Sequence, residues 1–179
     1  MIHNFFSVKG GVGTTTVACA FALSIDEPTT LIDAAPNSDA KGVLAVTSDD
    51  CEVTNNLRYL RLPEVGQDDV RNLTGRIVID WGTQEPQVDG KNILVSTLCY
   101  LSLRNATIKS PKIDGAILRS EEGRVLSEKD MYSVLGKPIL CMVRTDPVVA
   151  RAVDAGMLPT RLPTILNPIR NLTRKAAGV

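Results

Sequence analysis

The segment KGGVGTTT at residues 9–16 places the tightest constraint on what this chain can fold into. It follows an apolar stretch that reads as a strand, and it precedes small apolar residues that read as a helix. Glycines let a backbone turn tightly and direct successive N–H groups inward, and the helix adds the positive end of its dipole. Such a loop forms an anion cradle of phosphate size. The dinucleotide motif G-x-G-x-x-G does not fit, because Thr16 stands where its last glycine would be.

The rest of the chain alternates short β-branched runs with helical patterns, which is typical of a parallel sheet with crossover helices. Strands are predicted at residues 2–8, 30–33, 57–62, 76–80, 92–97, 114–119 and 139–143. Helices are predicted at residues 14–24, 98–106, 127–135 and 147–155, followed by a last basic helix. The predicted fold class is therefore α/β of the P-loop NTPase type, a mostly parallel central sheet of about seven strands with helices on both faces.

Length and charge limit the number of domains and the kinds of partner. With 179 residues, 44% of them hydrophobic, the chain can bury one substantial core but not two, so residues 1–179 are expected to form a single domain. Twenty basic residues balance twenty acidic ones, so binding to nucleic acid would require a local patch. The C-terminal segment supplies basic residues without any acid, namely Arg161, Arg170, Arg174 and Lys175.

The cysteines and the N-terminus exclude several other classes. The cysteines lie far apart, which excludes a zinc ribbon or a Cys-x-x-Cys motif, and they are expected to be buried small hydrophobes. His3 is the only histidine, is expected to be a partly exposed strand residue, and excludes any site that needs several imidazoles. The first apolar stretch is too short for a signal sequence or a membrane span, so a cytoplasmic location is expected. The cysteines are Cys19, Cys51, Cys99 and Cys141.

The loop departs from an ordinary P-loop at one position. The last glycine is usually followed by a lysine that meets the terminal phosphates and by a Ser or Thr that holds magnesium. Here Thr14 takes the lysine position and Thr15 the magnesium position. With Lys9 at its front, the loop resembles the K-G-G-x-G-K-[ST] pattern of the deviant Walker A family that contains ParA and MinD. The resemblance implies ATP or ADP with Mg²⁺, bound by Gly10, Gly11, Val12, Gly13, Thr14, Thr15 and Thr16.

Other segments resemble the same family. LIDAAPN at residues 31–37 is similar to its switch I, with Asp33 as the first acid and Ala35 in place of the second. RIVID at residues 76–80 resembles the Walker B strand, which implies that Asp80 contacts magnesium through water. The segment at residues 144–156 is similar to the one beside the adenine. The resemblance therefore implies a base-side wall made of Arg144, Thr145, Asp146 and Pro147.

The same resemblance implies a homodimer with nucleotide at its interface, in which Lys9 reaches the partner's phosphates. Lys9 and Asp33 are thus the implied catalytic residues. Removing one charge-stabilising group typically slows turnover by roughly 10²- to 10³-fold, so hydrolysis is expected to be slow or absent. The favoured function is ATP-dependent DNA partitioning, with non-specific DNA held by Arg170, Arg174 and Lys175, nucleoid association and a ParB-like activator.

The sequence also bears on three other functions. A positioning scaffold of the CpaE/TadZ kind resembles ParA and often carries the same GGVGTTT loop, which makes it the main alternative. Membrane positioning of the MinD kind is disfavoured, because the C-terminal sequence IRNLTRKAAGV is short and weakly apolar. A metabolic kinase or reductase would need a second substrate site or a cluster-binding cysteine pair, and the sequence displays neither.

Overall fold

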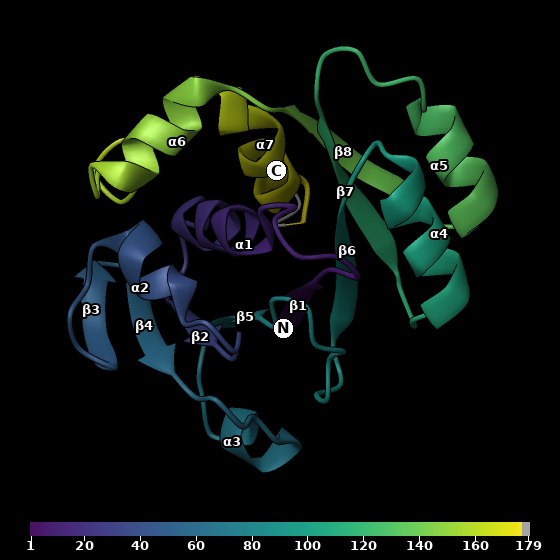
Figure 1. Ribbon diagram of the computed structural model, residues 1–179. Coiled ribbons are helices and arrows are strands. Elements are labelled where there is room, and N and C mark those ends of the chain that lie inside the picture. The colour runs from purple at the N-terminus through teal and green to yellow at the C-terminus, as the bar shows by residue number, and fades with distance from the viewer. Residues whose placement is uncertain (177–179) are drawn as a thin grey trace.

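The computed structural model describes the backbone of residues 1–176 and the side chains of residues 1–174. Its strands form one eight-stranded sheet in the order β3-β4-β2-β5-β1-β6-β7-β8 (Figure 1). All neighbouring strands are parallel except β3, which runs antiparallel to β4. The strands are β1 (Ile2–Phe6), β2 (Thr29–Asp33), β3 (Asp50–Thr54), β4 (Leu57–Arg61), β5 (Arg76–Asp80), β6 (Lys91–Thr97), β7 (Gly115–Ser120) and β8 (Ile139–Arg144).

Helices cover both faces of this sheet, as predicted (Figure 1). One buried cluster lies between the sheet and α1, α2, α6 and α7, and a second lies between the sheet and α3, α4 and α5. The helices are α1 (Thr14–Leu23), α2 (Asp39–Leu44), α3 (Gln67–Arg71), α4 (Tyr100–Lys109), α5 (Glu128–Leu135), α6 (Pro147–Asp154) and α7 (Asn167–Ala176), and a short 3₁₀ helix spans Thr164–Leu166.

The central position of β1 determines where the glycine-rich loop lies. Phe5 and Phe6 are buried, one in each cluster, because successive side chains of a strand point to opposite faces of the sheet. β5 and β6 pair with β1 on either side, and Phe5 is in register with Asp80. The loop that follows β1 therefore lies at the middle of the carboxyl edge of the sheet, beside the end of β5.

The sheet has one strand more than predicted. β3 forms a hairpin with β4, and the two strands are separated only by Asn55 and Asn56. The sequence DCEVT alternates half-buried Cys51 and Val53 with polar residues, and it is too polar and short to read as a central strand. An antiparallel edge strand of this kind needs no crossover helix, so the βαβ pattern does not reveal it. The short helices α2 and α3 were also not predicted.

His3 is buried rather than partly exposed. Its side chain is 3% exposed and packs against the ring of Phe21, with ring centroids 5.0 Å apart. Burial disfavours the imidazolium and lowers the pKa of His3 to about 4, and the positive charge of Arg76 acts in the same direction. The histidine is therefore a neutral core residue.

The cysteines only partly follow the prediction. Cys19 is completely buried, whereas Cys51, Cys99 and Cys141 are half-buried, and all four are free thiols. Half-burial of Cys141 reflects the place of β8 at the edge of the sheet. Among the helices of residues 1–176, none has both the length and the apolar character needed to cross a bilayer.

Helix α6 begins and ends where its sequence predicts. The carboxylate of Asp146 accepts a hydrogen bond from the N–H of Val148 at 2.8 Å, which makes it the N-cap, and Pro147 follows in the first turn. Gly156 adopts a positive φ of 63° just past the helix. A Cβ at Gly156 would lie 2.7 Å from the Cβ of Ala45, so the glycine also permits α6 to approach the end of α2.

Candidate nucleotide-binding site

The loop between β1 and α1 has the backbone shape of a phosphate cradle. Gly11 and Gly13 have positive φ angles of 75° and 84°, which glycine adopts without strain. The first helical hydrogen bond of α1 joins the N–H of Val17 to the carbonyl of Gly13 at 3.0 Å, and no side chain caps the helix. The N–H groups of the first turn, from Thr14 to Thr16, therefore have no carbonyl partner within the helix.

A cavity of about 340 Å³ opens beside these N–H groups. Its loop side is made of Gly10, Gly11 and residues 13–16, and Ala35, Asn37 and Asp39 contribute to its opposite wall. The cavity thus brings together the predicted cofactor-binding residues of the loop except Val12. The side chain of Val12 is instead buried in the core cluster beneath α1, where it anchors the loop.

Asp80 ends β5 and is completely buried; it does not itself line the cavity but contacts Thr15 and Gly82, which do. Its Oδ1 accepts a hydrogen bond from the N–H of Gly82 at 3.0 Å, while its Oδ2 has no hydrogen-bond partner among residues 1–174. Burial raises the pKa of Asp80 to about 6, although the hydroxyl of Thr15 and the N–H of Gly82 oppose the change. Buried polar atoms without a partner are rare in native proteins, so this oxygen requires an explanation.

A magnesium ion fits this donor set. Mg²⁺ prefers hard oxygen ligands, keeps several waters, and commonly combines one or two protein oxygens with phosphates. The hydroxyl of Thr15 and the free Oδ2 of Asp80 are oxygens of the required kind at the edge of the phosphate cradle. Within residues 1–174, no cluster of three His, Cys, Asp or Glu side chains could hold a metal by itself. An ion at this place would need the phosphates of a nucleotide as additional ligands.

Asp33 ends β2 in register with Asp80, as expected for acids at the carboxyl ends of neighbouring strands. Its carboxylate is buried and accepts hydrogen bonds from the hydroxyls of Tyr59 and Ser38 and from the N–H of Ala35. The Nη1 of Arg61 lies 3.2 Å from its Oδ1. Burial raises the pKa of Asp33, against the lowering effects of Arg61 and Tyr59. These bonds hold the start of the segment that follows β2, and Asp33 does not line the cavity.

Lys9 is not among the residues that line the cavity of its own chain. It is half-buried and forms no ion pair with any residue from 1 to 174. The positive charge of Lys9 acts electrostatically on Cys99, the N-cap of α4. Although burial opposes it, hydrogen bonds from Ser102 and Thr97 and the charge of Lys9 lower the pKa of Cys99 to about 7.

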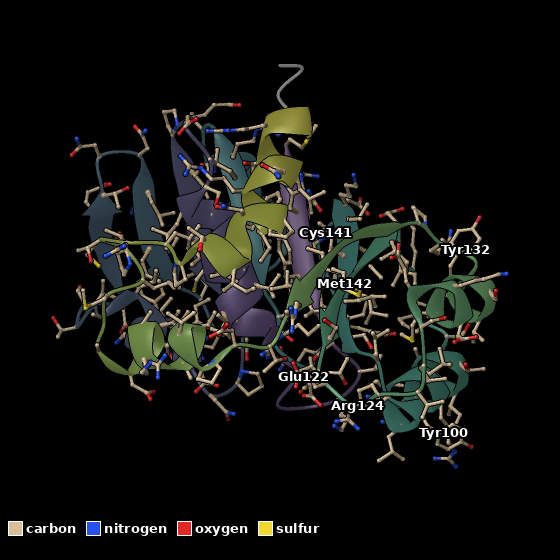
Figure 2. The ribbon with its side chains drawn as sticks, turned by 90° about the horizontal axis from the view of Figure 1, so that it is seen from above. Tyr100, Glu122, Arg124, Tyr132, Cys141 and Met142 are labelled. Atoms are coloured by element: carbon tan, nitrogen blue, oxygen red, sulfur yellow. The ribbon has the colours of Figure 1, made fainter. Side chains whose placement is uncertain are left out.

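Exposed apolar side chains surround this end of the molecule. Tyr100 and Leu101 are 69% and 55% exposed in the first turn of α4, next to Cys99. Arg124 interacts with the charge of Cys99, and the neighbouring Val125 is 96% exposed. Figure 2 labels Tyr100 and Arg124 at the same end of the molecule. A monomer therefore presents an apolar rim close to Lys9.

The predicted base-side wall does not line the cavity. Arg144 is exposed and pairs with Glu122 at 3.2 Å, and Asp146 and Pro147 form the start of α6. Thr145 accepts a long hydrogen bond of 3.4 Å from Arg119. These residues lie at the carboxyl end of β8, at the same edge of the sheet as the cradle. Because they do not line the cavity itself, their contact with a base stays a prediction.

Two residues beside the cradle were missed by the sequence analysis. Arg119, at the carboxyl end of β7, donates from Nη1 to the carbonyl of Val12 at 3.0 Å. Asp39, in the first turn of α2, is an exposed acid in the cavity wall. A charged residue that ends an apolar strand was the available signal for Arg119, and an acid shortly after the switch-like segment was the signal for Asp39.

The predicted DNA-binding residues lie on α7. Arg170 and Arg174 are exposed, are one helical turn apart, and form no ion pair with the described side chains. The side chain of Lys175 lies outside the described residues. Thr173, between the two arginines, is buried and donates a hydrogen bond to the carbonyl of Ser24 at 2.9 Å, which attaches α7 to the end of α1. This orientation leaves the basic face toward solvent.

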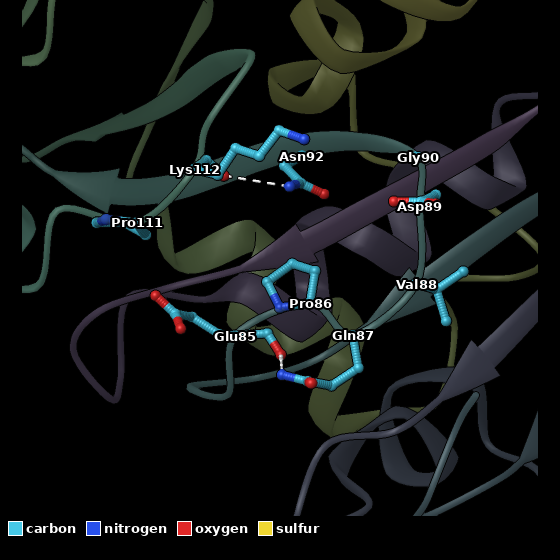
Figure 3. Close-up of a pocket in the computed structure, with 9 residues that line it drawn as sticks. All are labelled: Glu85, Pro86, Gln87, Val88, Asp89, Gly90, Asn92, Pro111 and Lys112. Carbon is cyan, nitrogen blue, oxygen red and sulfur yellow. Dashed lines mark hydrogen bonds between the residues drawn. The ribbon is translucent and has the colours of Figure 1, made fainter. Parts of the chain in front are cut away.

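A second pocket, of about 280 Å³, lies near the amino end of β6 (Figure 3). Its polar groups bind one another, since Asn92 donates to the carbonyl of Lys112 at 3.2 Å and Gln87 to the carbonyl of Glu85 at 3.0 Å. Ligands of open α/β sheets bind at the carboxyl ends of the strands. This pocket is at the opposite edge, so the cradle beside Asp80 remains the candidate functional site.

The sheet order, the loop after β1 and the acid that ends β5 together define the fold of a P-loop NTPase. No protein-family model matches the sequence, and a search of curated proteins finds no match. Comparison with solved structures narrows the fold class further. The chain has the ParA/MinD-like fold.

Three of these structures illustrate the likeness. MinD of Aquifex aeolicus, in its complex with MinC, has a TM-score of 0.79 at 16% identity, covering 99% of this chain and 96% of that one. MinD of Pyrococcus horikoshii, solved with Mg-ADP, has a TM-score of 0.76 at 18% identity, covering 98% and 95%. A ParA family ATPase of Chlorobium tepidum has a TM-score of 0.72 at 16% identity, covering 97% and 98%. At such identities the likeness establishes the fold.

Proposed function

We propose that this chain is a ParA-like dimeric switch for DNA partitioning that binds ATP with Mg²⁺ and hydrolyses it slowly or not at all. The observation that carries the proposal is the buried Oδ2 of Asp80, which has no partner among the described residues and lies next to Thr15 and Gly82 of a cavity walled by the N–H groups of the loop. An anion in the cradle and a cation beside Asp80 would satisfy both sets of groups at once. MgATP has this combination of charges.

In the proposed complex, the backbone N–H groups of residues 10–16 bind the β- and γ-phosphates. The hydroxyl of Thr15 and the carboxylate of Asp80 are the groups that would hold Mg²⁺ there. When bound, Mg²⁺ neutralises charge on the phosphates and so favours phosphoryl transfer. Arg144, Thr145, Asp146 and Pro147 form the side toward the base. MinD of Pyrococcus horikoshii, which has the same fold, was solved with Mg-ADP, and this supports the choice of ligand.

Hydrolysis is expected to be slow because two catalytic contributions are missing. Thr14 has no charge to stabilise the transferring phosphate, and Ala35 has no carboxylate to hold the attacking water. Asp33 is already engaged by Tyr59, Ser38 and Arg61, so we propose that it positions the switch segment and does not act directly on water. Asp39 is the acid whose exposure at the cavity would permit contact with water.

The proposed dimer brings Lys9 to the nucleotide of the partner. Lys9 lacks both a carboxylate partner among the described residues and a place in its own cavity, which supports a role across an interface. The rim of Tyr100, Leu101 and Val125 would become buried in the same step. Burial of apolar side chains is the main favourable term in most protein association.

Mixing the purified chain with ATP and Mg²⁺ tests the proposal. We expect calorimetry to detect binding and mass measurement to detect a dimer, with phosphate release far below that of an ordinary P-loop ATPase. Thr15→Ala removes the proposed magnesium ligand and should weaken MgATP binding much more than binding of ATP without Mg²⁺. Thr107→Ala, at an exposed threonine of α4 outside the cavity, is the matched control. Indifference of the natural chain to every purine nucleotide would overturn the proposal.

Partitioning requires contact with DNA, which we assign to Arg170, Arg174 and Lys175 on α7, with a ParB-like protein as the activator. Charge reversal of Arg170 and Arg174 to glutamate should abolish non-specific DNA retention, because few cations per chain give only weak binding, roughly 10⁻⁴ to 10⁻⁶ M at physiological salt. A gel shift at several salt concentrations measures the loss. Reversal of Arg104 and Lys109, exposed on α4, is the control, and equal retention by both double variants would reject the α7 surface.

The alternative function is a positioning scaffold of the CpaE/TadZ kind that binds nucleotide without turnover. The uncharged and buried Thr14 is the observation that favours it, because the loop then lacks its catalytic cation altogether. The two functions differ in DNA binding. MgATP binding without DNA retention and without phosphate release would favour the scaffold.

A further inference from the structure

The cradle lacks the lysine of an ordinary P-loop, yet a positive charge from another strand lies against it. Arg119 comes from β7, which is separated from β1 by β6. Its side chain extends across the carboxyl edge of the sheet and donates from Nη1 to the carbonyl of Val12 at 3.0 Å. A Cβ at Gly13 would collide with the same guanidinium, so the loop and the arginine are packed together.

The charge of Arg119 is not neutralised by any described carboxylate. The acid whose charge acts on Arg119 is Glu121, and the carboxylate of Glu121 is already bonded to Arg124. Among the described residues, the second nitrogen, Nη2, makes only the long 3.4 Å contact with Thr145. Partial burial lowers the pKa of Arg119, which indicates that water screens the charge incompletely. A partly desolvated guanidinium without a carboxylate partner is suited to attract an anion.

The hydrogen bond to Val12 directs this charge toward the cradle. The carbonyl of Val12 and the N–H of Gly13 belong to the same peptide group. A cation bound to the carbonyl oxygen polarises the group and makes its N–H a stronger donor, as in hydrogen-bond chains generally. The N–H at Gly13 belongs to a residue that lines the cavity, so a phosphate there would feel the charge of Arg119.

We propose that Arg119 replaces the missing P-loop lysine as the source of positive charge for the nucleotide's phosphates, acting as a positioning residue through the Val12–Gly13 peptide. This inference rests on the proposed function and identifies the group on which nucleotide affinity depends. It also predicts a hierarchy of ligands. The affinities for ATP and ADP should depend strongly on Arg119. The affinity for AMP should depend on it only weakly, because AMP would place fewer phosphate charges in the cradle.

Calorimetry on the full chain with Mg²⁺ tests this proposal, using the natural protein, Arg119→Met, Arg119→Lys and Arg104→Met. Arg104 is an exposed arginine on α4 outside the cradle. We expect Arg119→Met to weaken ATP binding by roughly 10- to 100-fold, the range for a lost charge-assisted hydrogen bond. Arg119→Lys should recover most of the affinity, and Arg104→Met should change nothing. ATP affinity of Arg119→Met should also depend less on salt concentration, since one charge is removed.

The outcomes separate the two proposals. If the natural chain binds no nucleotide, the proposed function fails and takes this inference with it. If the natural chain binds ATP and Arg119→Met binds it equally well, only the inference on Arg119 fails. Equal losses in Arg119→Met and Arg119→Lys, with an unchanged salt dependence, would show that the arginine only shapes the loop. That result would also overturn the proposal.

Discussion

Asp80→Asn is expected to make the nucleotide-free protein more stable at pH 7.5 while abolishing the contribution of Mg²⁺ to nucleotide binding. Burial raises the pKa of Asp80 to about 6, whereas an aspartate in the unfolded chain has a pKa of about 3.9. Above pH 6 the folded state therefore holds a buried charge with one unpartnered oxygen. Asparagine removes that charge, and each pKa unit corresponds to about 1.4 kcal/mol, so the gain is about 3 kcal/mol at most.

The sign of the pH dependence follows from the same difference. A carboxyl group whose pKa is raised on folding stabilises the protein fully below its unfolded pKa, and this stabilisation is lost as pH rises through the folded pKa. The natural protein without nucleotide should thus become more stable as pH falls from about 7 to 4, apart from the contributions of other groups. Asp80→Asn should lack this component.

Thermal unfolding from pH 4 to pH 8 measures the effect, and calorimetry with and without Mg²⁺ measures the binding. Asp26→Asn is the control, because Asp26 is an exposed acid between α1 and β2 that does not line the cavity. Binding of Mg²⁺ requires the ionised carboxylate, so the magnesium-dependent part of ATP affinity should decrease below about pH 6. A less stable Asp80→Asn protein at pH 7.5, or one with unchanged magnesium dependence, would contradict the assignment of Asp80.

Thr14→Lys is expected to give the second large effect, an increase in ATP hydrolysis of roughly 10²-fold. Thr14 is the first residue of α1 and lines the cavity, so a lysine there would place a cation beside the phosphates. The hydrolysis rate of this variant should remain below that of an ordinary P-loop ATPase, since Ala35 still provides no carboxylate for the attacking water. ATP should also bind more tightly.

Phosphate release under saturating ATP checks this expectation. Thr14→Met is the matched control, because methionine has a long side chain without charge and tests whether bulk alone changes the loop. Equal turnover by the lysine and methionine variants would show that the absent charge does not limit hydrolysis. The switch would then be limited elsewhere, for example by the switch segment held by Asp33.

The features that were predictable from the sequence are local ones. The turn at Gly11 and Gly13 and the start of α1 at Thr14 depend on residues that are adjacent in the chain, so their spacing predicts the cradle. The position of Asp33 and Asp80 at the same edge of the sheet was also predictable, because both acids end buried parallel strands; their pairing in register was not. The cap at Asp146 and the glycine after α6 follow from residues within two turns of one another.

The features that were missed depend on contacts between distant segments. Periodicity along the chain does not indicate that β7 lies two strands from β1, and only this order brings Arg119 to Val12. In the same way, His3 was expected to be partly exposed, because its own strand does not reveal that Phe21 of α1 packs against it. β3 escaped prediction because its pairing with β4 compensates for a weak apolar pattern.

The sequence by itself determined a phosphate cradle on an α/β sheet, together with the threonine in place of its lysine. Backbone geometry and hydrophobic alternation are short-range properties, and both can be read from neighbouring residues. The tertiary structure decided which charged side chains lie beside that loop. Packing leaves an oxygen of Asp80 without a partner, commits Asp33 to Tyr59 and Arg61, and brings Arg119 to the loop, because electrostatic interactions depend on distance in space and on exclusion of water rather than on separation along the chain.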